Sequence, residues 1–297
     1  MQISASMVKE LRERTGAGMM DCKQALSENS ADFEAAVDWL RKKGIAKAEK
    51  KSGRVAAEGM VTTLVEGPVG AIIEVNAETD FVARNEHFTT FSNGLAKLVL
   101  DSGETDIEKL KTMPWATGGT VGEQLTTLIA TIGENMSIRR AAVLRVSKGA
   151  VASYIHMNGK IGVLVGIEGE GDAAKFAEAA KNVAMHVAAA NPQFLDRSQV
   201  DGSALERERE IFAEQARQGG KPENIVEKIV EGRLNKFYEE VCLTEQAFIM
   251  DTDHKVGDVV AKLGGGAKIA GFVRFQLGEG IEKEMGDFAS EVAAMAG

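Results

Sequence analysis

The side chains that most often perform chemistry in proteins are few in this sequence and far apart. The 297 residues include four histidines and two cysteines, and all six are widely spaced along the chain. A structural zinc site or a disulfide framework requires more of these residues at closer spacing. Neither a His-Glu-x-x-His helix nor a calcium-binding loop occurs. We therefore predict no metal site and no enzymatic activity, unless the fold assembles a catalytic site from distant residues.

Two further features have residue types that bind ligands elsewhere. Glycine-rich segments occur at 16–18 and 264–266, but neither has the Lys-Ser/Thr ending of a phosphate loop or the full glycine spacing of a dinucleotide fingerprint. Three acids, Glu74, Glu78 and Asp80, lie close together, yet a divalent cation needs more ligands than these supply. A solvated loop after a strand is the simpler interpretation of the acids, and we expect no cofactor.

The composition is that of a globular chain with an uneven charge. Apolar residues make up 44% and charged residues 27%, which is typical of a globular protein. The length of 297 residues is enough for two or three domains. Residues 1–54 hold 11 Lys/Arg and 8 Asp/Glu, so this segment carries +3 and the remainder −12 of the net −9. This balance argues against general nucleic-acid binding. No apolar run approaches the ~20 residues of a membrane span, no signal-peptide pattern is evident, and cysteine is scarce, which together predict a cytoplasmic protein.

Any functional residue must be positioned by regular elements, and the first 54 residues predict a small helical bundle. Three short helices are expected, over about 7–14, 19–25 and 32–43. Ser6 is the expected cap of the first, and Gly44 is expected to end the third. The basic strip 47–54 that follows is either a linker or an exposed helix.

The remainder alternates between strand and helix periods in two similar rounds. The first round is predicted as strands at 60–65 and 71–75, helices at 88–100 and 124–132, and a strand at 138–146. The second is predicted as strands at 150–156 and 161–167, helices at 173–189 and 256–263, and a strand at 269–276. We infer an α+β fold with two related core subdomains, 55–147 and 148–284. The stretch 103–122 follows no clear pattern.

The second subdomain contains an insertion at about 200–243. A charged helix over Leu205–Gln218 is followed by Gly219-Gly220, and a second helix starts after Pro222 and runs to about Val241. Two antiparallel helices joined by a glycine turn form a helical hairpin. Such an arm either packs back on its own body or reaches a partner, and the sequence leaves both open.

The segment Thr79–Val82 directly follows the second predicted strand and has two interpretations. In the first, Thr79 or Asp80 caps a helix and Phe81 packs against it as a hydrophobic staple. In the second, Asp80 and Phe81 form a projecting tip, in which an exposed aromatic ring anchors an interface.

Several stretches, in order from one end of the chain to the other, resemble the bacterial elongation factor Ts family. They are Val8–Lys23, Thr79–Val82, Ile132–Asn135, Ile138–Arg140, Met185–Ala189, Val230–Arg233 and Gly278–Lys283. The resemblance implies a ubiquitin-associated-like three-helix head, a two-part core, a coiled-coil insertion and a C-terminal helix at 285–297. It also implies a function, acceleration of GDP release from the GTPase elongation factor Tu by dislodging its magnesium ion.

The resemblance further implies which residues meet that partner. The predicted magnesium-displacing tip comprises Thr79, Asp80, Phe81 and Val82. The other predicted contacts are Lys9, Arg12, Met19, Met20, Lys23, Lys51, Ile132, Gly133, His156, Ile249 and Met250. From the residues alone, the methionines could be core, the cations a solvated face, Gly133 a helix cap, and Ile249 and Met250 part of a strand.

Alternative functions remain in competition at this point. The head and arm could serve a protein-interaction scaffold that leaves nucleotide exchange untouched. A nucleic-acid binder using Arg41 to Arg54 would show steep salt dependence, but the acidic body disfavours it. We predict elongation factor Tu as partner, with neither nucleic acid nor membrane, and the arm could support a dimer of factor–partner pairs.

Overall fold

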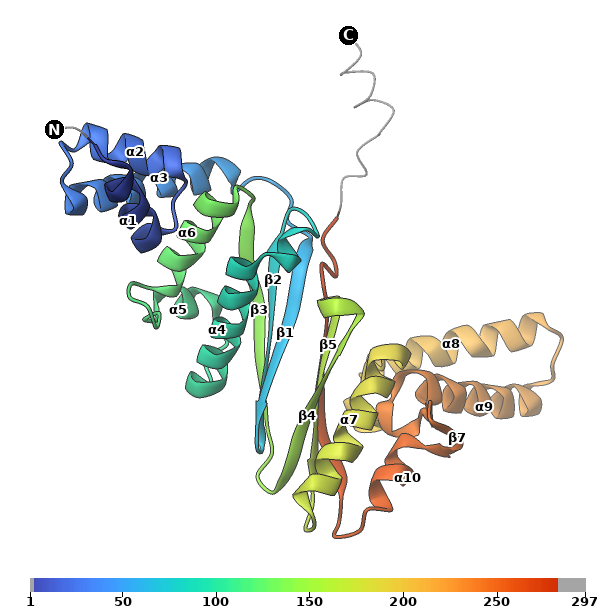
Figure 1. Ribbon diagram of the computed structural model, residues 1–297. Helices are drawn as coiled ribbons and strands as arrows, with labels where there is room; N and C mark the ends of the chain where they lie inside the picture. Colours follow the sequence, from blue (N-terminus) through green and yellow to red (C-terminus); the bar gives the residue numbers. More distant parts are fainter. Residues whose placement is uncertain (1–2, 283–297) are drawn as a thin grey trace.

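The computed structural model describes residues 3–282, which form a helical head, a body of two sheets flanked by helices, and a projecting helical arm (Figure 1). Helices and strands are both abundant and the strands are antiparallel, which confirms the predicted α+β class. Within these residues, no helix has both the length and the hydropathy needed to cross a bilayer.

Three helices make up the head: α1 (Ala5–Thr15), α2 (Met19–Glu28) and α3 (Phe33–Lys51). The hydroxyl of Ser4 accepts the Met7 amide at the start of α1, so the predicted cap at Ser6 is wrong by two residues. Gly16 ends α1 in the left-handed region, with φ 68°. Apolar side chains from all three helices form a core of their own.

The third helix is longer than the sequence predicts. We expected it to end at Gly44, but it continues to Lys51, so the basic strip up to that residue is helix and not linker, with Lys47 and Lys51 half-buried. Gly44 faces α6 (Val121–Ile132), where a Cβ on Gly44 would lie 3.5 Å from that of Ala130. The glycine therefore permits a close contact between head and body, and this packing outweighs its helix penalty of about 1 kcal/mol.

The first half of the body is a sheet with helices on one face. Its strands are β1 (Glu58–Glu66), β2 (Val69–Ala77) and β3 (Met136–Arg145), in the order β1-β2-β3. Helices α4 (Glu86–Ser102), α5 (Ile107–Thr112) and α6 cover it. Within the stretch 103–122, α5 is an element that the sequence pattern did not reveal.

The second half repeats this arrangement. Its strands are β4 (Gly149–His156), β5 (Ile161–Glu168) and β8 (Lys268–Gln276), in the order β4-β5-β8. Helices α7 (Ala173–Ala190) and α10 (Val256–Ala261) and a two-stranded ribbon, β6 (Ala247–Phe248) and β7 (Asp251–Lys255), pack against its outer face. In each half a hairpin is followed by helices and by a strand that returns beside the second hairpin strand.

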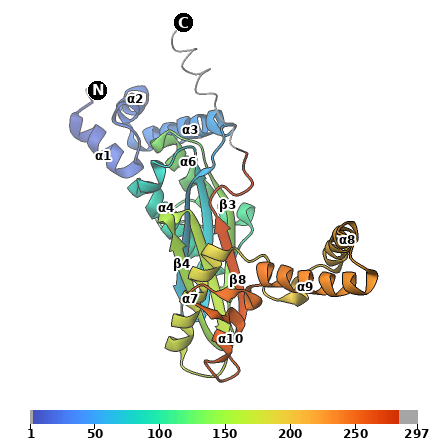
Figure 2. The same ribbon diagram turned by 90° about the vertical axis from the view of Figure 1, so that its right-hand side faces the viewer.

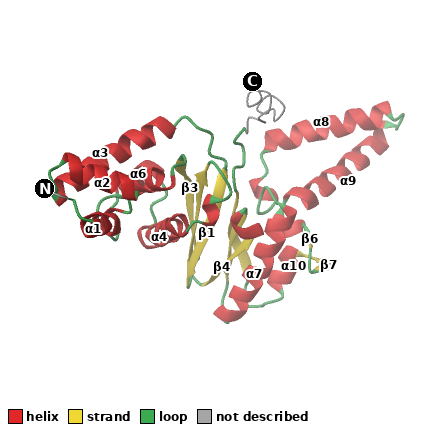
Figure 3. Ribbon diagram, turned by 45° about the horizontal axis from the view of Figure 1, so that its top comes forward, coloured by secondary structure: helices red, strands yellow, loops and turns green. Residues whose placement is uncertain are grey.

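The two sheets pack face to face, between the two sets of helices (Figures 1 and 3). Strand alternation explains this arrangement, since successive side chains point to opposite faces. Ile72 of β2 and Leu164 of β5 belong to the core between the sheets, whereas Ile73 and Val163 pack under the helices. Gly162, at the start of β5, admits the Val61 side chain of β1, because a Cβ there would lie 2.5 Å from Val61 Cγ1.

The insertion forms the predicted hairpin of α8 (Gly202–Gln218) and α9 (Glu223–Val241). Its small core lies between the two helices and includes Val226 and Val230. Figures 1 and 2 show the arm projecting away from the sheets, so it does not fold back over the body. The domain boundaries remain predictions, and the predicted C-terminal helix at 285–297 lies outside the described residues.

Candidate functional site

The segment after β2, residues 79–82, forms a tip with an outward aromatic ring. The Phe81 side chain is 77% exposed, and Asp80 is exposed beside it. The residue that caps α4 is Asn85, whose side chain accepts the amides of His87 and Phe88. The structure therefore favours the projecting tip over the helix cap with a packed Phe81.

The last residue of the tip, Val82, is buried, unlike Asp80 and Phe81. Val82 is only 3% exposed and belongs to the core beneath the first sheet. The Val82 side chain is therefore packed within its own subdomain, and the part of Val82 in the magnesium-displacing tip stays a prediction. Val82 anchors the short 3-10 turn Val82–Arg84 immediately behind Phe81.

A carboxylate on the neighbouring loop holds the first residue of the tip, Thr79, from behind the exposed Phe81. Glu134, between α6 and β3, accepts the Thr79 amide at 2.9 Å and the Thr79 hydroxyl at 2.6 Å. Hydrogen bonds to a charged acceptor are stronger than those between neutral groups. Thr79 is therefore held at both its main chain and its side chain, directly before Asp80 and Phe81.

A second set of hydrogen bonds ties the same loop to the end of the head. The Glu78 carboxylate accepts the Asn135 amide and pairs with Arg54 at 3.4 Å. In return, Asn135 Nδ2 donates to the Arg54 carbonyl at 2.6 Å. The start of the tip, the loop before β3 and the segment before β1 are thus joined through polar side chains.

The residues of that loop that are predicted to contact the partner lie beside the tip, and some of them already interact within the chain. Gly133 ends α6 with φ 89°, as expected of a cap, and Ile132 packs partly against the core. Lys51 is half-buried and donates to the Gly133 carbonyl, so its ammonium joins α3 to α6. The Lys51 ammonium already has one acceptor within the chain, and its contact with a partner protein stays a prediction.

The head presents the remaining predicted cations and both methionines to solvent. Lys9, Arg12 and Lys23 are exposed, and Met19 and Met20 are 61% and 73% exposed. The methionines are therefore not core residues. They lie in the first turn of α2, where apolar side chains without an intramolecular partner are available for binding.

The helix α2 is fixed to α3 by one acid. Asp21 accepts from Lys47 at 2.6 Å and from Lys43 at 3.0 Å. The hydrogen bond from Lys47 is the largest influence, and together these lysines hold the pKa of Asp21 below its ordinary value despite partial burial. The exposed methionines are thus carried on a helix with a fixed orientation.

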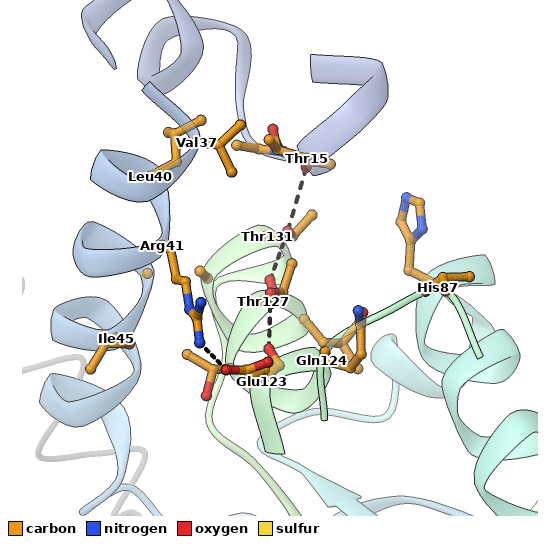
Figure 4. Close-up of a pocket in the computed structure, with 18 of the residues that line it drawn as sticks. Thr15, Val37, Leu40, Arg41, Ile45, His87, Glu123, Gln124, Thr127 and Thr131 are labelled. Carbon is orange, nitrogen blue, oxygen red and sulfur yellow. Dashed lines mark hydrogen bonds and ion pairs between the residues drawn. The ribbon is translucent and has the colours of Figure 1, made fainter. Parts of the chain in front are cut away.

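A groove of about 850 Å³ separates the head from α4 and α6 (Figure 4). Arg41 of α3 pairs with Glu123 of α6 across it, and Thr131 donates to the Gly16 carbonyl at 3.4 Å. None of the predicted contact residues lines this groove. It is therefore a separate feature from the tip.

Three further predicted contacts lie on turns of the second half. His156 is exposed before the β4–β5 turn, where its Nδ1 lies 3.1 Å from the Tyr154 hydroxyl. Ile249 and Met250 form the β6–β7 turn and are 45% and 50% exposed. This pair is therefore not part of a strand core.

Residues that could perform chemistry have structural roles instead. Glu74 is fully buried and pairs with Arg139 at 3.0 Å and Arg140 at 2.6 Å. Burial would raise the pKa of Glu74, but the hydrogen bonds from the Gly278 amide and these arginines lower it overall. Burial also raises the pKa of the Cys242 thiol to about 11. Among residues 3–282, no three His, Cys, Asp or Glu side chains gather as a metal site would require.

Comparison of the sequence with known proteins assigns the chain to a family. The family described as Elongation factor TS matches residues 78–279. The chain belongs to the elongation factor Ts family. Proteins named Elongation factor Ts from Magnetococcus marinus and Rhodospirillum centenum are each 58% identical, over 99% and 100% of this chain and 98% and 99% of their own. One from Syntrophotalea carbinolica is 54% identical over 99% of this chain and 99% of its own.

The functional role of this member is thus in translation elongation. Sequence reasoning gave the exposed tip as one of two interpretations and missed the residues that hold it, Glu134 and Asn135. Both lie in a stretch that resembles elongation factor Ts, directly after the glycine that ends α6. Glu134 and Asn135 follow the end of α6 and therefore do not stabilise that helix. Two polar residues at such a point are the one sequence signal that could have indicated a tertiary role.

Proposed function

We propose that this chain is the guanine nucleotide-exchange factor of elongation factor Tu. The observation that carries the proposal is the 77% exposed Phe81 ring on a tip whose main chain is clamped from behind. A large aromatic side chain left in water serves no purpose in the subdomain's own core. Aromatic residues of this kind are typical anchors of protein interfaces.

In the proposed mechanism, Phe81 inserts between two helices of the partner's nucleotide-binding domain, near its magnesium ion, and Asp80 competes for polar groups there. The shift of the helices disrupts the water shell that holds the ion. Without magnesium, the charge of the GDP phosphates is poorly neutralised and GDP leaves faster. The chain performs no bond-breaking step, so the proposal includes no enzymatic activity and no cofactor of its own.

Linkage sets the energy that this mechanism requires. If the factor weakens GDP binding, then GDP weakens factor binding by the same ratio. A thousandfold effect corresponds to about 4 kcal/mol. Burial of one phenylalanine ring contributes roughly 2 to 3 kcal/mol, so the tip needs flanking contacts to reach that value. The exposed methionines of the head and the turns of the second half are the proposed source.

The decisive experiment is the release of labelled GDP from elongation factor Tu. Wild-type protein is expected to accelerate release, and Asp80→Ala/Phe81→Ala is expected to lose most of that acceleration. The matched control is Leu263→Ala, a 37% exposed apolar residue after α10. Equal release with the wild type and the tip variant would refute the mechanism. Binding without any acceleration by the wild type would favour the scaffold function.

The proposal extends to location and assembly. Translation elongation places the protein in the cytoplasm, with elongation factor Tu as its partner and without direct contact to nucleic acid or membrane. The projecting arm could join two factor–partner pairs. Light scattering of the complex, with and without the arm residues 202–241, distinguishes a single pair from a dimer of pairs.

A further inference from the structure

A buried network of hydrogen bonds, here called the polar relay, lies beneath the β6–β7 turn. It transfers no proton and has no part in the mechanism above. His186 on α7 is 1% exposed, and Gln246 is 6% exposed. His186 Nε2 lies 2.8 Å from Gln246 Oε1, and Gln246 Nε2 donates to the Glu240 carbonyl at 2.7 Å. The relay therefore joins α7 to the last turn of α9, at the base of the arm.

The other ring nitrogen of His186 faces the turn itself. The Ile249 amide donates to His186 Nδ1 at 3.3 Å. Because Nδ1 accepts, the proton of the neutral ring must be on Nε2, which is the nitrogen that faces the Gln246 oxygen. Burial lowers the pKa of His186, which keeps the ring neutral near pH 7. Each polar atom of the ring thus has one complementary partner.

Packing alone does not explain a histidine at this position. The ring lies among apolar groups, with the Phe248 ring centroid at 5.9 Å, and belongs to a helix whose neighbouring residue Val187 is fully buried. An apolar side chain would fill such a place without the free-energy cost of burying the polar side chains of His186 and Gln246. What an apolar residue cannot do is accept the amide of the turn.

We infer that His186 is a positioning residue, which fixes the exposed Ile249–Met250 turn relative to the arm so that the turn meets the partner protein. The inference rests on the proposed function, because the partner is elongation factor Tu. A two-stranded ribbon of this size has little stability alone, so its turn needs an anchor. A turn ordered before binding loses less conformational entropy on association.

Two substitutions of His186 separate positioning from packing. His186→Phe keeps a ring but removes the acceptor, and its affinity for nucleotide-free elongation factor Tu is expected to fall about 10-fold. His186→Asn places an amide oxygen near the position of Nδ1 and is expected to stay within about threefold of the wild type. Equal losses in the two variants, or no loss in a folded His186→Phe protein, would overturn the inference.

A double-mutant cycle with Met250→Ala supplies the readout that a general structural role would not change. Met250→Ala is expected to weaken binding about 10-fold, and the double variant with His186→Phe is expected to be no weaker than about 20-fold. Additive losses, about 100-fold together, would show that His186 does not act through the turn. No effect of Met250→Ala would also overturn the inference.

The control is Val187→Ala, which removes buried volume from the same helix. It is expected to lower thermal stability, to leave affinity near that of the wild type and to add independently to Met250→Ala. If it instead couples to Met250→Ala as His186→Phe does, the turn responds to any loss of packing and the inference fails. Failure here leaves the exchange function intact, whereas a wild-type protein that does not bind elongation factor Tu would remove both.

Discussion

The central strands β2 and β5 end in connections of opposite character. After β2, the Phe81 ring is 77% exposed. After β5, the chain passes through Gly169 and Gly171 into α7, where Phe176 is 1% exposed. A Cβ on Gly169 or Gly171 would lie 3.2 Å or 3.0 Å from the Phe176 ring, so the glycines make room for it. The first copy also buries an aromatic residue at the start of its helix, Phe88 at 0% exposure, so the exposed Phe81 ring is an addition that the second connection lacks.

The two connections nevertheless share a supporting device. Glu78, after β2, accepts the amide of Asn135 on the loop that leads into β3. Glu168, at the end of β5, accepts the amide of Ser147 on the loop that leads into β4, at 3.0 Å. The scaffold is therefore duplicated, while the exposed ring of Phe81 occurs in the first copy alone among the two connections. Such a difference shows that activity depends on the residues carried by a fold rather than on its topology.

The bulges of the two central strands differ in the same sense. The register shifts between Glu74 and Val75 in β2 and between Gly166 and Ile167 in β5. At the first bulge, the buried Glu74 carboxylate binds two arginines and the Gly278 amide. At the second, the glycine only admits the Val146 side chain, since a Cβ would lie 2.8 Å from it. The copy that bears the tip is therefore also tied to the segment after β8.

The largest contrast is expected between Phe81→Ala and Phe176→Ala. Phe81→Ala removes an exposed ring, so acceleration of GDP release should fall about 100-fold while the free energy of unfolding changes by less than about 0.5 kcal/mol. Phe176→Ala leaves a cavity and should lower the free energy of unfolding by about 3 to 5 kcal/mol, with normal exchange per folded molecule. Denaturant unfolding and GDP release measure both. Equal destabilisation by the two variants would make the tip structural.

Removal of the buried charge at the first bulge is expected to have the next largest effect. Glu74→Gln leaves Arg139 without an acid and Arg140 with Glu279 alone, and it should lower the free energy of unfolding by about 3 kcal/mol at pH 7. The pKa of Glu74 is lowered on folding, so its contribution is present above the unfolded pKa and is lost as pH falls through the folded value. The difference between the variant and the wild type should therefore shrink in acid. A constant difference from pH 7 to pH 3 would contradict this account.

Sequence patterns predicted the elements well because their signals are local. The β-branched residues of β2, a strand buried on both faces, and the three-to-four-residue spacing in α7 are both local signals, so the duplicated sheets and the arm could be predicted. Gly44 misled because its role depends on α6, which the local sequence of α3 does not contain. The same limit applied to α5, whose one fully buried apolar side chain, Leu110, makes a weak periodic signal.

The candidate site was predictable in its position but not in its support. Both interpretations of Thr79–Val82 required an aromatic residue beside an acid, so only the tertiary structure could decide whether Phe81 was exposed. The clamp joins Thr79 to Glu134, 55 residues apart, through a pairing of β2 with β3 that fixes both loops. The burial of Val82 and the bond from Lys51 to the Gly133 carbonyl were missed for the same reason, since both depend on residues distant in sequence.

Loss of the clamp should affect exchange more than stability. Glu134→Ala leaves the Thr79 amide and hydroxyl without an acceptor, so the tip should lose its fixed position and exchange should slow about 10-fold, or about 1.4 kcal/mol. Glu123→Ala is a matched control, because it removes an acid of α6 that pairs across the groove. That control should leave exchange within about twofold of the wild type. Equal slowing by the two variants would indicate a general effect on α6.

The smallest difference is expected between Glu78→Ala and Glu168→Ala, which remove the same kind of bond from the two connections. Glu78→Ala removes the bonds to Asn135 and Arg54, but Glu134 still holds Thr79, so exchange should slow only about threefold. The bond from the Ser147 amide lowers the pKa of Glu168, but this half-buried residue belongs to the other sheet from the one that bears the tip. Glu168→Ala should therefore leave GDP release unchanged. Slowing by Glu168→Ala equal to that by Glu78→Ala would mean that exchange depends on the stability of both halves rather than on one clamped tip.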